Sequence, residues 1–190
     1  MIARPDPNFL HLLATVLVCL SLPSCYPIRQ TYFTPTAPGG TTVPNECHQQ
    51  LGPRGTINIE LDNVKITVRT RPQSDVLTVA VYGIRENEVS FGAGHFAINS
   101  NSGTRMLIPT RVLEYHANSL NNGRVILFEN SFKMVSERIY HISFDELPTK
   151  DDLFTFSMPS LLINNKEVAI PVVTFTKIME WRMEMVVLNC

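Results

Sequence analysis

Apolar and polar residues alternate with a period of two along most of the chain after residue 55. Ile57, Ile59 and Leu61 are separated by polar residues, and the alternation resumes over residues 64–68 after Asp62-Asn63. Because successive side chains of a β-strand point to opposite faces, this pattern predicts half-buried strands. The Asp-Asn pair predicts a tight hairpin turn or, alternatively, a bulge within one strand.

More short strands are predicted as far as residue 176. Residues 76–84 are apolar on both faces, which is typical of a central strand. Two glycines in Gly92-Ala93-Gly94 indicate a bulge or a close approach of backbones. Asn122-Gly123 suits the turn of a tight hairpin, and Asn164-Asn165 is another hairpin signal. The other predicted strands cover residues 57–61, 64–68, 89–91, 95–98, 105–108, 111–117, 124–129, 132–144, 161–163, 167–170 and 172–176.

The segment 178–190 fits both a helix and a strand. Trp181 and Met185 belong to an apolar stripe with helical spacing, but residues 179–185 also alternate strictly between apolar and polar side chains. The alternation leads into the β-rich Val186-Val187, so we predict a strand. The tryptophan and the methionines are then expected to fill the core, with a soft surface for a partner as the alternative.

About nine or ten short strands, with no long amphipathic helix, indicate an all-β fold. We predict an antiparallel β-sandwich of immunoglobulin-like character. A closed barrel is the alternative, since the number of strands does not distinguish the two. Residues 154–170, with Pro159 and Pro171 bounding two strands, predict an edge hairpin, because proline cannot donate into a ladder. Such an edge is a candidate docking site for a strand of another chain, but we favour the alternative of a protected edge that binds no partner.

An apolar run over residues 12–22 precedes this β-rich region. It is shorter than the roughly 18 residues that a membrane-spanning helix needs, so it predicts a secretory signal peptide over residues 1–24. The run ends in Leu22-Pro23-Ser24-Cys25. This sequence resembles the lipobox of bacterial lipoproteins, which has an aliphatic residue at position −3, a small residue at −1 and then cysteine. Ordinary secretory cleavage after Ser24 is the alternative.

The resemblance implies a lipid modification and a location. In bacterial lipoproteins the cysteine sulfur receives a diacylglyceryl group and a peptidase cleaves before it, so Cys25 would be the first residue of the mature protein. The chain would then be exported and held by lipid at the cell envelope, at the outer membrane facing the periplasm. The resemblance covers residues 1–25 and implies nothing about the fold that follows.

Residues 25–54 are rich in Pro, Thr and Gly and show no hydrophobic period. We therefore predict a flexible tether over 25–54, followed by one β-sandwich domain over residues 55–190. A flexible chain from Cys25 to Cys47 has a root-mean-square span of about 25–30 Å. On this interpretation the domain would stay near the bilayer without contacting it.

Two of the four cysteines remain after the signal peptide and the lipidated residue are set aside. Cys47 and Cys190 are expected to form a disulfide in an oxidising compartment, with two free thiols as the alternative. The chain carries 16 basic and 17 acidic side chains. This balance gives no electrostatic indication of a nucleic-acid partner.

The candidate chemistry is sparse, with no nucleophile elbow, P-loop or dinucleotide motif. His95, His116 and His141 fall on three predicted strands and would form a metal site only if the fold brought them together. A second candidate is the loop FDELPTKDD over residues 144–152, whose crowded carboxylates suit either a calcium ion or a solvated acidic loop. Its spacing does not match an EF-hand, so we expect the solvated loop, and no metal or other cofactor.

Two functions remain open at this level. The first is a non-catalytic accessory or binding protein of the cell envelope, which is anchored by lipid on Cys25 and recognises a protein partner or a surface polymer. The alternative is an envelope hydrolase whose site is assembled from separate strands, for example from His95, His116, His141 and Asp145. We favour the binding protein, and the hydrolase requires those side chains to converge in a pocket.

Overall fold

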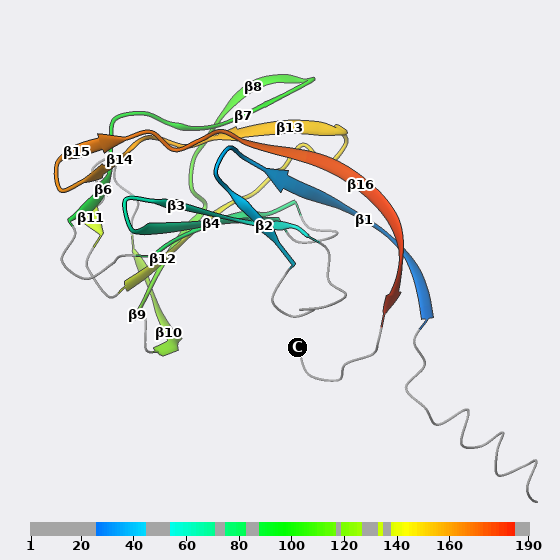
Figure 1. Ribbon diagram of the computed structural model, residues 1–190, viewed down its shortest axis with the longest axis horizontal. Helices are drawn as coiled ribbons and strands as arrows, with labels where there is room; N and C mark the ends of the chain where they lie inside the picture. Colours follow the sequence, from blue (N-terminus) through cyan, green and yellow to red (C-terminus); the bar gives the residue numbers. More distant parts are fainter. Residues whose placement is uncertain are drawn as a thin grey trace, which may run out of the picture. The chain divides into compact units, whose positions relative to one another are not determined.

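The computed structural model describes residues 26–44, 54–70, 75–82, 88–116, 119–126, 133–134 and 138–184. All regular elements in these residues are β-strands (Figure 1). The chain divides into two compact units: Thr31–Met179 form the larger, and the described residues 26–30 and 180–184 belong to the smaller. None of the described residues forms a helix long and apolar enough to cross a bilayer.

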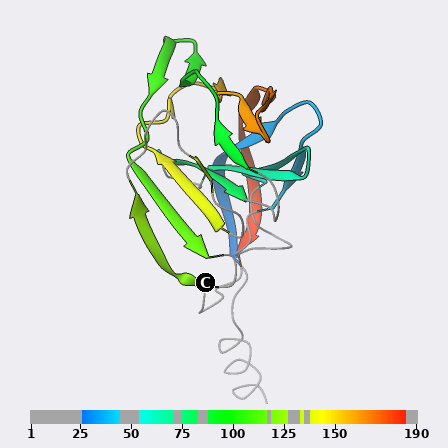
Figure 2. The same ribbon diagram turned by 90° about the vertical axis from the view of Figure 1, so that its left-hand side faces the viewer.

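The strands form three sheets, in which neighbours such as β12 and β5, β13 and β16, and β14 and β6 are antiparallel. Sheet A has the order β1-β16-β13-β7-β8, sheet B the order β10-β9-β12-β5-β4-β3-β2, and sheet C the order β11-β6-β14-β15. Figure 2 shows β10, β9 and β12 of sheet B side by side. The strands of sheet A are β1 (Tyr26–Thr36), β16 (Val173–Glu184), β13 (Leu153–Ser157), β7 (Phe96–Ser100) and β8 (Gly103–Leu107). Those of sheet B are β10 (Ser119–Ile126), β9 (Arg111–His116), β12 (Arg138–Phe144), β5 (Leu77–Tyr82), β4 (Val64–Thr70), β3 (Thr56–Leu61) and β2 (Thr41–Val43). Those of sheet C are β11 (Lys133–Met134), β6 (Val89–Phe91), β14 (Leu161–Ile163) and β15 (Lys166–Val168).

Two hairpins follow directly from their turn residues. Asp62 and Asn63 have φ angles of 44° and 68° and join β3 to β4. Asn164 and Asn165, with φ angles of 51° and 64°, join β14 to β15. A two-residue hairpin turn of this kind needs positive φ at both positions, and Asn and Asp tolerate it better than most side chains. The prediction of a hairpin at each site is confirmed, and the alternative of a bulge at residues 62–63 is wrong.

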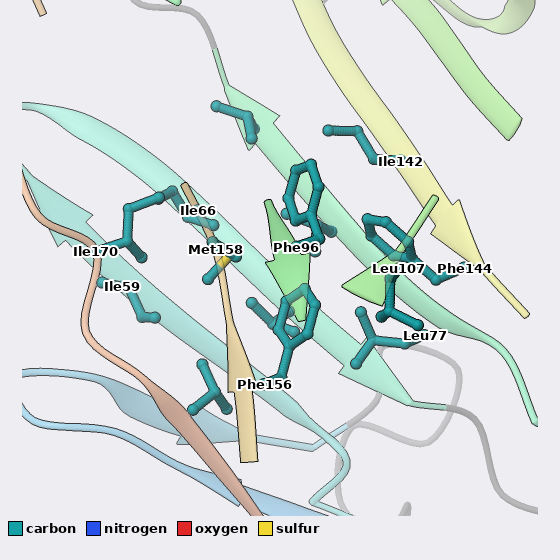
Figure 3. Close-up of a cluster of buried hydrophobic side chains, with 14 of the residues drawn as sticks. Ile59, Ile66, Leu77, Phe96, Leu107, Ile142, Phe144, Phe156, Met158 and Ile170 are labelled. Carbon is teal, nitrogen blue, oxygen red and sulfur yellow. The ribbon is translucent and has the colours of Figure 1, made fainter. Parts of the chain in front are cut away.

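The core lies between sheets A and B and is filled by the alternate side chains of their strands. In β4 the side chains at every second position from Val64 are buried, as the period of two requires. Phe96 and Phe156 of sheet A both contact Phe144 of sheet B, with ring centroids 4.8 Å and 5.8 Å away (Figure 3). Residues of sheet C join the same apolar cluster. The predicted all-β antiparallel sandwich is therefore confirmed.

The central strand and the close backbone approach are also found where the pattern predicted them. β5 lies between β4 and β12 in the middle of sheet B, which explains why it is apolar on both faces. Gly92 donates its N–H to the carbonyl of Ser160 at 2.7 Å. A Cβ at this position would lie 2.5 Å from Ser160 Oγ, so a larger residue does not fit.

The tether predicted over residues 25–54 is wrong for residues 26–43. β1 and β2 lie there, and the side chains of Tyr32 and Phe33 are buried. The prolines in this segment led to the prediction of a tether. However, β1 is an edge strand of sheet A, and an edge strand tolerates a residue that lacks a backbone N–H. The sheets therefore begin before residue 55, and residues 45–53 lie outside the described part of the chain.

The turn predicted at Asn122-Gly123 is also wrong. Both residues lie inside β10, where the register against β9 shifts between Ser119 and Arg124. The strands are connected by residues 117–118, which are outside the described ranges. Gly123 instead allows the backbone to approach the ring of Tyr115, because a Cβ there would lie 2.5 Å from Cε1.

The strand predicted near the C-terminus is confirmed, because β16 continues to Glu184. Its tryptophan and first methionine do not fill the core, however. Val173 and Phe175 are buried, whereas Met179 and Trp181, at the same parity of the strand, are exposed. The alternation therefore predicted the strand correctly. It did not predict at which residue of the strand the buried core ends.

Candidate binding surface

Strand β8 forms one free edge of sheet A. It pairs with β7 from Ser100↔Gly103 to Phe96↔Leu107 and is the last of the described strands in the order of the sheet. The β7–β8 hairpin lies at the margin of the sheet in Figure 1. An edge of this kind presents backbone N–H and C=O groups that can pair with another strand.

Exposed apolar side chains lie at the end of this strand, after the exposed Thr104 and Arg105. Leu107 pairs with Phe96 and is buried, whereas Met106 pairs with Ala97 on the opposite face and is 68% exposed. Ile108, which follows the strand, is 84% exposed. Natural proteins usually protect free edges with charges, bulges or proline, and β8 carries Arg105 and is followed by Pro109. Met106 and Ile108 nevertheless leave two large apolar side chains exposed to water. We name Met106, Ile108 and the backbone of β8 the β8 edge.

The one charged side chain of β8 is paired within the molecule. Arg105 Nη1 lies 3.0 Å from Glu146 Oε2, and Nη2 donates to the carbonyl of Glu146. Glu146 has a φ angle of 64°, and both its carboxylate and its carbonyl contact the guanidinium. This contact connects the loop after β12 to β8. It also offsets the positive charge of Arg105, which would otherwise disfavour pairing of β8 with a strand of another chain.

The edge that the sequence predicted, in the hairpin bounded by Pro159 and Pro171, is different in character. β15 is indeed the last strand of sheet C. Its Lys166 lies 3.7 Å from Asp62, and its Glu167 accepts a 2.6 Å hydrogen bond from Ser160 Oγ. Charged side chains of this kind protect an edge from other strands. The β8 edge is therefore the better candidate for docking.

Sequence reasoning missed the β8 edge, although one signal was present. Met106, Leu107 and Ile108 are consecutive apolar residues directly before Pro109. Such a run is expected in a central strand that is covered on both faces. Here the run covers the last two residues of an edge strand and the residue before a proline, and only one of its three side chains is buried.

A polar cluster lies where β9 and β12 pair. Tyr140 Oη donates a 3.0 Å hydrogen bond to Glu114 Oε1. Arg138 Nη1 lies 3.0 Å from the other carboxylate oxygen, Glu114 Oε2. The Glu114 side chain is 10% exposed. Both carboxylate oxygens are therefore engaged by the protein itself, so this cluster fastens two strands together and is not an open catalytic site.

The structure places two of the predicted histidines, His95 and His141, in different sheets or their loops. His95 is exposed in the loop before β7 of sheet A, whereas His141 lies in β12 of sheet B, 5.0 Å from the ring of Tyr115. His141 is on the face opposite the buried Tyr140 and Ile142. His116 ends β9, and its side chain is outside the described set. Within the described residues, no group of three or more His, Cys, Asp or Glu side chains could hold a metal.

The acidic loop is held by the protein's own donors. Asp152 lies 3.7 Å from Lys177 Nζ, which also donates to the carbonyl of Thr149 at 2.9 Å. Asp151 accepts a 3.2 Å hydrogen bond from Ser102 Oγ. Glu146 is paired with Arg105, while Asp145, the carboxylate proposed for a hydrolase, is exposed directly after β12. These contacts favour the solvated loop over a calcium site.

Cys25, Cys47 and Cys190, the residues predicted for lipidation and for the disulfide, lie outside the described ranges. Comparison with known proteins finds no protein-family model, no curated protein and no solved structure that matches this chain.

Proposed function

We propose that this chain is a non-catalytic accessory or binding protein of the cell envelope, which is held at the membrane by lipid on Cys25 and binds a partner chain at the β8 edge. The observation that carries the proposal is the exposure of Met106 and Ile108 beside a free strand. The lipobox-like Leu22-Pro23-Ser24-Cys25 supports the anchor.

The physical basis is strand addition. A partner strand would pair with the backbone of β8, and its alternate side chains would cover Met106 and Ile108. Burial of each large apolar side chain contributes about 1.5–3 kcal/mol. An anchor on Cys25 raises the local concentration of the domain near envelope partners, so a modest affinity is sufficient. A protein strand therefore suits this surface better than a surface polymer does.

The disulfide between Cys47 and Cys190 remains part of the proposal. It would close a ring of most of the domain, and the loop-entropy model gives up to about 5 kcal/mol for a ring of that size. A thiol count under denaturing, non-reducing conditions tests it. Two reactive thiols at these positions would contradict the bond.

Site-specific photocrosslinking tests the β8 edge. A photoreactive phenylalanine analogue at position 106 is expected to give a discrete protein adduct in intact cells, and Ile108→Lys in the same chain should abolish it. The matched control carries the analogue at position 125, because Val125 lies on β10, an edge strand of sheet B, and is 63% exposed. No adduct at 106, or equal adducts at both positions, would refute docking at β8.

Mass spectrometry of the mature N-terminus tests the anchor separately. We expect an N-terminal peptide that begins at Cys25 and carries the mass of the lipid, with Cys25→Ala abolishing the modification. A mature chain that begins elsewhere, or that begins at Cys25 without lipid, would contradict lipid anchoring and leave the test of the β8 edge unaffected.

A further inference from the structure

The first and last strands of the described chain are neighbours. β1 and β16 are adjacent in sheet A, and Figure 1 shows that they run in opposite directions. Thr36, at the end of β1, donates to the carbonyl of Thr174 near the start of β16. The beginning of β1 is therefore paired with the later part of β16. Residues 26–30 and 180–184 accordingly belong to one compact unit.

This unit carries the single tryptophan of the chain. Trp181 lies near the end of β16 and is 71% exposed. Arg29 of β1, in the same unit, is also exposed. An indole has a large apolar body and one N–H donor, and such side chains concentrate where membrane meets water. The described residues of this unit carry Arg29 and Arg182 against Glu180 and Glu184, so their charges balance and a contact with lipid would depend on the indole.

The lipidation residue proposed above directly precedes this unit. Cys25 is followed by Tyr26, the first residue of β1. Trp181 is three residues from Glu184, the end of β16. At about 3.4 Å per residue this is about 10 Å along the strand. This distance is of the same order as the headgroup layer of one leaflet, which is about 5–8 Å thick.

We infer that Trp181 inserts into the headgroup layer of the membrane that holds Cys25, so that β1 and β16 form a second, non-covalent contact with lipid. This inference rests on the proposed anchor. The occupant is the bilayer, because the lipid on the residue before β1 would hold the membrane beside this unit at a high effective concentration. The inference replaces the expectation of a domain that stays clear of the membrane on a flexible tether.

The single tryptophan makes the test direct. Mature lipidated protein is reconstituted into vesicles of phosphatidylethanolamine and phosphatidylglycerol, and emission of Trp181 is recorded with and without brominated lipid. We expect emission at shorter wavelength, severalfold weaker quenching by acrylamide and strong quenching by brominated lipid. Cys25→Ser protein with the same vesicles should keep the emission of an indole in water.

A second variant tests whether the contact is local. Val125→Trp in a Trp181→Phe background moves the only indole to a similarly exposed residue of β10. It should be quenched several times less by brominated lipid than the chain with Trp181, and equal quenching would overturn the inference. Lipidated protein that sediments with vesicles while Trp181 stays in water would overturn the inference and leave the anchor intact. Mature protein that does not sediment with vesicles would overturn both.

Discussion

Removal of one buried hydroxyl tests how the polar cluster between β9 and β12 contributes to stability. Tyr140 is 1% exposed, and its Oη donates to Glu114 Oε1 at 3.0 Å. Tyr140→Phe keeps the ring in the core and removes the hydroxyl that donates to Glu114. Arg138 remains 3.0 Å from the other carboxylate oxygen. The change therefore isolates one donor to a largely buried carboxylate.

The expected loss follows from the charge and burial of the acceptor. A hydrogen bond to a charged group contributes about 1.5–3 kcal/mol, and Glu114 has little access to water that could replace the lost donor. The ion pair with Arg138 persists, so we expect the lower part of this range, about 1.5–2 kcal/mol. For a chain of this size the melting temperature should fall by about 3–8 °C.

Urea and thermal unfolding, followed by circular dichroism, measure this loss. A double-mutant cycle with Glu114→Gln isolates the pair, and we expect a coupling free energy of about 1 kcal/mol, because the two groups share one hydrogen bond. A Tyr140→Phe protein within about 0.5 kcal/mol of the parent would refute the assigned role, as would strict additivity in the cycle.

Three further stability predictions use matched substitutions and the same unfolding assay. Phe154 lies in the core between the rings of Phe33 and Phe175, so Phe154→Ala should lower the free energy of unfolding by about 3–5 kcal/mol. Leu153 is adjacent and half-exposed, so Leu153→Ala should lower it by less than about 1 kcal/mol, and similar losses for the two variants would contradict the assigned core. Among the described residues Thr34 Oγ1 is buried without a hydrogen-bond partner, so Thr34→Val should stabilise the protein by about 1 kcal/mol. Thr70→Val removes the hydrogen bond to the carbonyl of Phe33 and should destabilise it by about 0.5–1.5 kcal/mol. Changes in stability of the same sign for both variants would contradict this reasoning. Asn63→Val places a β-branched residue at a φ angle of 68° and should lower the free energy of unfolding by about 1–3 kcal/mol, whereas Asn63→Gly should leave it nearly unchanged. An Asn63→Val protein as stable as the parent would contradict the turn geometry.

Local patterns predicted the hairpins because their determinants are local. The alternation on either side of Asp62-Asn63 identifies two strands, and the tolerance of positive φ identifies the turn between them. The same reasoning failed at Asn122-Gly123. There the glycine serves the close approach of Tyr115, a contact with a neighbouring strand that turn chemistry does not describe.

The tether was mispredicted because proline content was taken as evidence against a strand. Tyr32 and Phe33 carry the aromatic side chains that strands favour, but Pro35 and Pro38 follow closely. An edge strand needs only one row of backbone hydrogen bonds, so the prolines do not exclude β1 from the sheet. Whether a strand lies at an edge depends on the order of the sheet, which the sequence did not reveal.

The same dependence explains why the β8 edge escaped prediction. Met106 and Ile108 look like core residues in the sequence, and they are exposed because β8 is the last strand of its sheet. Likewise, three histidines on predicted strands do not show which sheet each strand joins. The structure places His95 and His141 at different sheets, so the pocket required by the hydrolase hypothesis does not follow from them.

The pairing of β1 with β16 also has a consequence for the order of folding. The contact between Thr36 and Thr174 spans 138 positions of the chain. Closing a loop of that length costs about 4 kcal/mol in chain entropy, and contacts so distant in sequence slow folding. A ribosome or a translocation channel releases the N-terminal strand long before its partner. Sheet A therefore cannot be completed until the last strand has emerged, and a chain that stops before residue 173 would leave both β1 and β13 without that neighbour.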